Sequence, residues 1–165
     1  ITGFNNWGKT RIISDIFDVG AFRHDRLHML PSTGYDFLVL PKSNDDLGLR
    51  LYCEEYYERM ENLRNLGIKP DYIASAFCPT REPERRVLRG PKNSNSINII
   101  RELYGKDEVH MLLLEYKWCG HAQLRTNEIK AFYSGERNVK VHSIGSTTYA
   151  NRLITALNTI NAQLP

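Results

Sequence analysis

The sequence predicts an α/β fold, a three-layer sandwich with a mostly parallel central sheet. Short apolar runs typical of strands alternate along the chain with segments of helical periodicity. Parallel strands need long crossover connections, which are usually helices, and the alternation supplies them. The length of 165 residues suits one domain with its own core, so we expect a single domain over residues 1–165.

Five apolar runs are the strand candidates. Val109–Tyr116 (VHMLLLEY) is the clearest candidate for a central strand, and Tyr35–Leu40 (YDFLVL) reads as a buried one because its apolar residues are nearly continuous. The other strand candidates are Arg26–Leu30, Asp71–Cys78 and Val139–Ile144.

Five segments are helix candidates, three of them with apolar residues on one face at helical spacing. The longest, Leu49–Leu66, is followed by Gly67 and Pro70, which are typical helix stop signals. The other candidates are a helix that begins after Thr10 and the segments Ser96–Tyr104, Gln123–Tyr133 and Thr147–Ile160.

Composition excludes several classes of protein. No apolar run approaches the length that crosses a bilayer, so no membrane partner is expected. The three cysteines are an odd number without a CxxC spacing, which argues against a disulfide framework or a zinc knuckle. A reducing compartment such as the cytoplasm is therefore expected. The net charge of +3 is compatible with an anionic ligand.

The segment Gly3–Thr10 (GFNNWGKT) carries the strongest functional signal. It satisfies the pattern G-x-x-x-x-G-K-[ST] in full. Glycines allow backbone angles that point successive N–H groups at a phosphate, Lys9 reaches the terminal phosphates, and the Thr10 hydroxyl suits Mg²⁺. The helix expected just downstream directs its positive end toward the same anion.

On those eight residues the sequence resembles the P-loop NTPase superfamily, possibly its nucleotide kinases. The resemblance implies a P-loop NTPase-like fold that binds ATP, or another nucleoside triphosphate, together with Mg²⁺. It assigns nucleotide contacts to the residues of the loop: Gly3, Asn5, Asn6, Trp7, Gly8, Lys9 and Thr10. Trp7 could instead pack under the loop. Ile1 and Thr2 would end the strand before the loop, so we expect that the N-terminal strand is truncated.

The resemblance also implies an acidic residue at the end of a neighbouring strand, after four apolar ones. Glu115 follows four apolar residues, Met111–Leu114, and would hold the metal with Thr10 or polarise the nucleophile. Asp45 and Asp46 follow another predicted strand at the corresponding end and are alternatives for this role.

A basic segment at about residues 80–95 interrupts the regular pattern and reads as a mobile flap. Three of its arginines, Arg81, Arg85 and Arg86, are candidates to stabilise charge on a phosphoryl group during transfer. The same cations would also suit the backbone of a nucleic acid.

The sequence therefore predicts a P-loop kinase or NTPase, with Mg-dependent phosphoryl transfer to an unknown small acceptor or hydrolysis as its reaction. Three alternatives remain open: a nucleotide-dependent module that binds nucleic acid or protein, a GTPase switch, and a phosphate-binding domain without turnover. The GTPase reading lacks an Asn-Lys-x-Asp tetrad.

Overall fold

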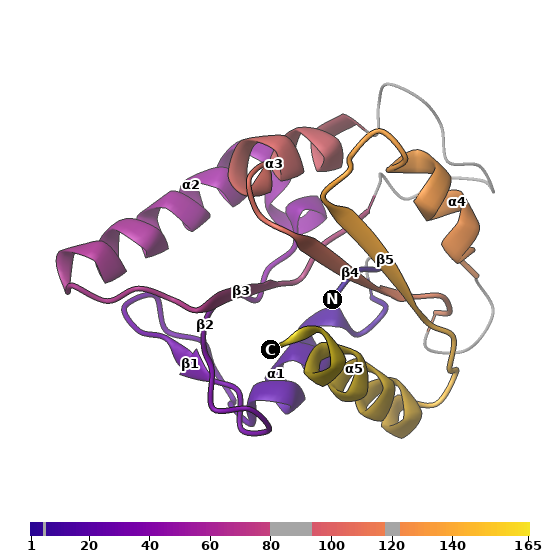
Figure 1. Cartoon of the computed structure of the whole chain (residues 1–165), viewed down its shortest axis with the longest axis horizontal. Helices are drawn as coiled ribbons and strands as arrows, with labels where there is room; N and C mark the ends of the chain where they lie inside the picture. Colours follow the sequence, from indigo (N-terminus) through magenta and orange to yellow (C-terminus); the bar gives the residue numbers. More distant parts are fainter. Residues whose placement is uncertain (5, 80–93, 118–122) are drawn as a thin grey trace.

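The computed structural model describes residues 1–4, 6–79, 94–117 and 123–165. Helices and strands alternate along it, which confirms a mixed α/β architecture (Figure 1). The elements are α1 (Lys9–Phe17), β1 (His28–Met29), β2 (Asp36–Leu40), α2 (Asn44–Asn65), β3 (Tyr72–Ser75), α3 (Ser94–Tyr104), β4 (Val109–Leu114), α4 (Thr126–Phe132), β5 (Val139–Ile144) and α5 (Tyr149–Gln163).

The strands form two small sheets. One has the order β1-β2-β3, with β1 antiparallel and β3 parallel to β2. The other is the parallel pair β4-β5. The single, mostly parallel central sheet that the sequence predicts is therefore not shown by these two sheets.

The N-terminal residues lie between the two sheets. Thr2 makes isolated parallel bridges with Phe77, just beyond β3, and with Leu113 of β4. Its N–H donates to the Leu112 carbonyl over 2.8 Å, and its own carbonyl accepts from the Leu114 N–H over 2.8 Å.

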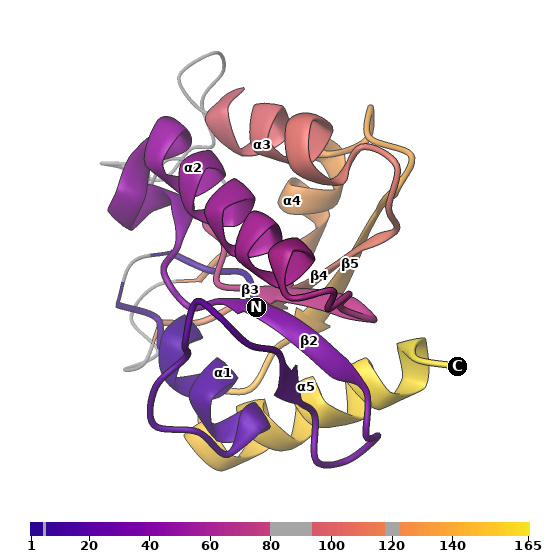
Figure 2. The same cartoon turned by 90° about the vertical axis from the view of Figure 1, so that its left-hand side faces the viewer.

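Helices cover both faces of the strands. α2, α3 and α4 lie on one side, and α1 and α5 lie on the other (Figure 2). The buried side chains between these layers form one apolar core, to which the central residues of β2 and β4 contribute. Within the described ranges no helix is both long enough and apolar enough to span a membrane.

His28 on β1 gives the core a titratable group. Its side chain is buried, with its ring 4.9 Å from that of Phe22. Burial, and then the charge of Arg26, lower its pKa below the ordinary value. The folded state therefore disfavours the imidazolium form.

We expect the protein to lose stability as the pH falls below about 6.5, the ordinary histidine pKa, because the unfolded chain then binds the proton more tightly than the folded chain. His28→Phe should reduce this loss. Urea unfolding of both proteins at pH 7.5 and pH 5 measures it. An equal difference between the two pH values in both proteins would show that His28 does not contribute.

Candidate functional site

The Gly3–Thr10 loop follows Thr2, which bridges the two sheets, and leads into α1. Two of its residues, Asn6 and Gly8, have positive φ angles of 60° and 89°. Gly8 is the residue before α1, and neither a side-chain cap nor an acidic residue in the first turn satisfies the N-terminus of that helix. The first-turn N–H groups thus retain the positive electrostatic character of a helix start.

Lys9 is buried at this helix start, with 6% of its side chain exposed. Its ammonium donates to the Phe4 carbonyl oxygen over 3.0 Å, so the side chain folds back over the loop. The nearest recorded carboxylate oxygen is Asp45 Oδ1, at 3.8 Å. That distance is at the outer limit of an ion pair, so the buried charge is only loosely compensated.

Thr10 joins the start of α1 to the end of β2. Its hydroxyl donates to the Pro41 carbonyl over 2.9 Å, and the residue is exposed. A hydroxyl oxygen that donates its proton keeps lone pairs for a cation. The geometry is therefore compatible with the metal contact predicted for Thr10.

The segment between β2 and α2 is tightly organised. Ser43 and Asp46 form a reciprocal capping box at the start of α2, and the Ser43 hydroxyl also donates to Asp45. Asn44 pairs with the backbone of Cys78 twice, accepting from its N–H over 2.7 Å and donating to its carbonyl over 3.1 Å. These contacts fix Asp45 beside Lys9 and join the ends of β2 and β3.

Glu115 follows β4, as predicted, but its recorded contacts lie at another helix. Its Oε1 accepts from the backbone N–H of Thr126 over 3.3 Å and from the Thr126 hydroxyl. Its Oε2 is close to Gly145, where an added Cβ would lie 3.2 Å away. In the described parts of the chain, no hydrogen bond or ion pair joins Glu115 to Lys9 or Thr10, whereas an ion pair joins Asp45 to Lys9.

Trp7, which could either contact the nucleotide or pack under the loop, is buried, with 2% of its surface exposed. Its ring meets that of Phe4 edge to face, with centroids 5.4 Å apart. The structure thus makes Trp7 an anchor of the loop. Gly3, another of the predicted nucleotide contacts, does not have a positive φ angle, so its backbone lies outside the left-handed region.

Several predicted residues lie outside the described ranges. They are Asn5 and the arginines of the basic segment, Arg81, Arg85 and Arg86. Among the residues that are described, no three His, Cys, Asp or Glu side chains gather into a metal site.

Sequence reasoning missed Arg152 on α5. It is fully buried, and its guanidinium donates to the Ser146 carbonyl over 2.8 Å and to the Lys117 carbonyl over 3.1 Å. Burial lowers its pKa. Arg152 holds together the segments that follow β4 and β5, and a single cation in an amphipathic helix gives no sequence signal of that role.

Comparison with known proteins gives one informative match. No family model matches the chain, and no solved structure matches it significantly. A curated inosose isomerase from Bacillus velezensis is 26% identical over 108 residues, which is 66% of this chain. The match spans 37% of the isomerase, little more than a third of its length.

The assignment to the P-loop NTPase superfamily is therefore wrong. The relative that the comparison finds is an isomerase by name and not an NTPase, and no family model supports the assignment. The physical reason for the error is that eight residues specify a loop but not a superfamily, since a short pattern of glycines and a lysine can occur in unrelated folds.

Proposed function

We propose that the protein binds a nucleoside triphosphate, ATP in the first instance, at the start of α1, and that it transfers the terminal phosphoryl group to a small acceptor or to water. The observation that carries the proposal is the buried ammonium of Lys9, held at an uncapped helix N-terminus with its nearest recorded carboxylate 3.8 Å away. A polyphosphate would compensate that charge and accept hydrogen bonds from the first turn of the helix.

The strand arrangement supports a ligand at this end of the molecule. We infer that Ile1–Gly3 joins the two small sheets into one layer, in the order β1-β2-β3, then Ile1–Gly3, then β4-β5, parallel except for β1. The bridges of Thr2 to both sides support this layer. Ligands of parallel α/β sheets bind outside the carboxyl ends of the strands, and Lys9, Thr10 and Asp45 all follow such ends.

The oxygen atoms near Lys9 fit a nucleotide-bound Mg²⁺. This ion keeps several waters and usually takes only one or two protein oxygens besides the phosphates, so a cluster of three ligands is not required. Thr10 Oγ1 and an Asp45 carboxylate oxygen would hold it, and the ion would neutralise charge on the phosphates. Glu115 as a metal ligand remains a prediction, and its contacts with Thr126 favour Asp45 in its place.

Four earlier expectations remain predictions. They are the role of the arginines in stabilising the transferred group, the small acceptor, a contact with nucleic acid, and the cytoplasmic location.

A second candidate function is the isomerisation of an inosose. The observation that favours it is the match to the inosose isomerase over 66% of this chain.

A nucleotide titration tests the proposal directly. Mg·ATP at one hundred times its dissociation constant should stabilise the folded state by about 2.7 kcal/mol, because only the folded chain binds it. Thermal unfolding is followed with ATP, GTP and AMP, each with Mg²⁺ or with EDTA. A parallel assay follows the interconversion of inosose. Stabilisation by no triphosphate would overturn the proposal, and turnover of inosose would establish the second candidate.

A further inference from the structure

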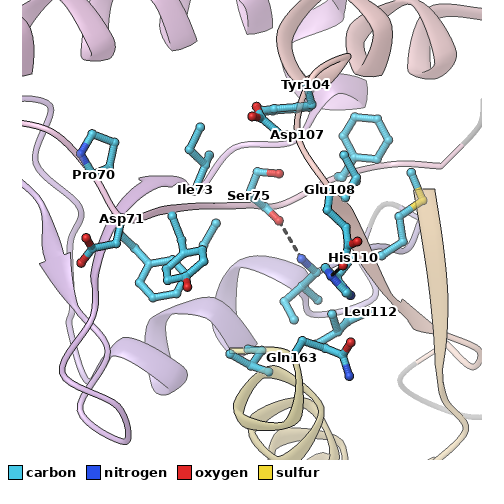
Figure 3. Close-up of a pocket in the computed structure, with 18 of the residues that line it drawn as sticks. Pro70, Asp71, Ile73, Ser75, Tyr104, Asp107, Glu108, His110, Leu112 and Gln163 are labelled. Carbon is cyan, nitrogen blue, oxygen red and sulfur yellow. Dashed lines mark hydrogen bonds and ion pairs between the residues drawn. The ribbon is translucent and has the colours of Figure 1, made fainter. Parts of the chain in front are cut away.

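A cavity of about 780 Å³ lies between β3 and β4, at the ends of these strands remote from Lys9. Its walls include Ile73 and Ser75 of β3 and His110 and Leu112 of β4, which face each other across the gap (Figure 3). The amino group of Ile1 closes one end and donates to the Ser75 carbonyl over 2.7 Å.

Both strands turn an open backbone edge toward this cavity. In a strand, alternate residues direct their N–H and C=O groups to opposite neighbours. Just beyond β3, the Ala76 N–H donates to Leu40 of β2, whereas the Ser75 carbonyl and the Phe77 N–H bond Ile1. The backbone groups of Ile73 and the Ser75 N–H therefore point away from β2 and into the cavity.

The same alternation applies on β4. Val109 bonds toward β5, while Leu112 and Leu114 bond Thr2. The N–H and C=O groups of His110 and the N–H of Leu112 therefore face the cavity as well. Backbone groups that remain unpaired away from water are costly, so two such edges favour an extended strand between them.

The amino group of Ile1 indicates how that strand connects. Burial, and then the charge of Lys9, lower its pKa to about 5. A peptide N–H at the same position would make the same hydrogen bond to Ser75 with no charge to desolvate. The site is thus better suited to an amide than to an ammonium group.

We propose that this cavity is a strand slot whose occupant is an extended apolar segment, peptide-bonded to Ile1 and parallel to β3 and β4. The register follows from Thr2, which lies opposite Phe77 and Leu113. The first residue ahead of Ile1 donates to the His110 carbonyl and accepts from the Leu112 N–H. The second donates to the Ile73 carbonyl and accepts from the Ser75 N–H.

The walls also define the length and character of the segment. Tyr72, the first residue of β3, precedes Phe77 by five positions, so a strand in this register needs about four residues ahead of Ile1 to reach it. Most of the residues that line the cavity are apolar, among them Phe37 and Ile13, and its acidic lining residues include Asp71 and Glu108. The residues next to Ile1 should therefore be apolar.

Two extended chains test the slot. One carries Val-Val-Ile-Val ahead of Ile1, and the matched control carries Val-Val-Pro-Pro, which keeps the length and the amide at Ile1. The two prolines remove the donor N–H groups on both edges and so disfavour the paired strand as a whole, including its carbonyl contacts with Ser75 and Leu112. Amide exchange is measured for Ser75 and Leu112. We expect the two amides to exchange more slowly in the first chain than in the control, by a factor of roughly ten or more. Paired amides exchange only when the structure opens.

Equal exchange in the two chains would overturn the proposal. A free acetylated Val-Val-Ile-Val peptide is added to the chain of 165 residues as a further arm. Protection of Ser75 and Leu112 by this peptide, without protection in the fused chain, would overturn the covalent connection to Ile1. The measurement involves no nucleotide, so its failure is independent of the proposed function.

Discussion

We expect Lys9→Ala to lower the affinity for Mg·ATP by about ten- to a hundredfold. Hydrogen bonds to charged groups contribute roughly 1.5–3 kcal/mol each, and the variant loses those that Lys9 would make to the phosphates. Isothermal titration of the variant and the parent chain with Mg·ATP measures this difference. Lys42→Ala is the matched control, since Lys42 is an exposed lysine between β2 and α2. It removes the same formal charge and should leave the affinity within about twofold, because exposed charges are well screened.

The variant must also be shown to fold. Lys9 bonds the Phe4 carbonyl and faces Asp45, so its removal changes the loop as well as its charge. Lys9→Arg keeps the charge and should retain more affinity than Lys9→Ala. The proposed function fails if the Lys9→Ala variant has the same unfolding temperature as the parent chain and binds Mg·ATP as tightly. The triphosphate would then not bind at this lysine.

Local patterns predicted the elements well. Val139–Ile144 was predicted as a strand and forms β5 over the same residues, and Tyr35–Leu40 contains β2. Tyr35–Leu40 is nearly continuously apolar between Gly34 and Pro41, and Val139–Ile144 contains three β-branched apolar residues. The long helix begins earlier than predicted, at Asn44, because a short turn capped by Ser43 continues into it across a kink at Gly48, whose φ is 77°.

The candidate site was predicted less completely. Gly8, Lys9 and Thr10 belong to a contiguous motif, and the structure places them together at the start of α1. The pairing of Asn44 with Cys78 joins residues 34 positions apart and leaves no trace in local periodicity. Glu115 has the strand-end position that its pattern indicates, but only the tertiary structure brings Thr126 to its carboxylate.

Trp7→Ala is expected to have the largest effect on stability. The side chain is 2% exposed and packs edge to face on Phe4 inside the core. Truncation of a buried Phe or Trp to Ala costs about 3–5 kcal/mol, from lost burial and from the cavity that remains. Trp7→Phe fills part of that volume and should cost less. Urea unfolding measures the free energy of both variants, provided that each transition is two-state.

A control at the surface separates burial from the loss of apolar atoms. Ile154 on α5 is 55% exposed, and Ile154→Ala should change the unfolding free energy by less than about 1 kcal/mol, since alanine also favours a helix. A loss at Trp7→Ala no larger than this would contradict its role as the anchor of the loop. The side chain would then be free to face a ligand, as the sequence first suggested. Mg·ATP should in that case protect the Trp7 fluorescence from quenching by iodide, whereas an indole packed in the core is shielded from iodide with or without the nucleotide.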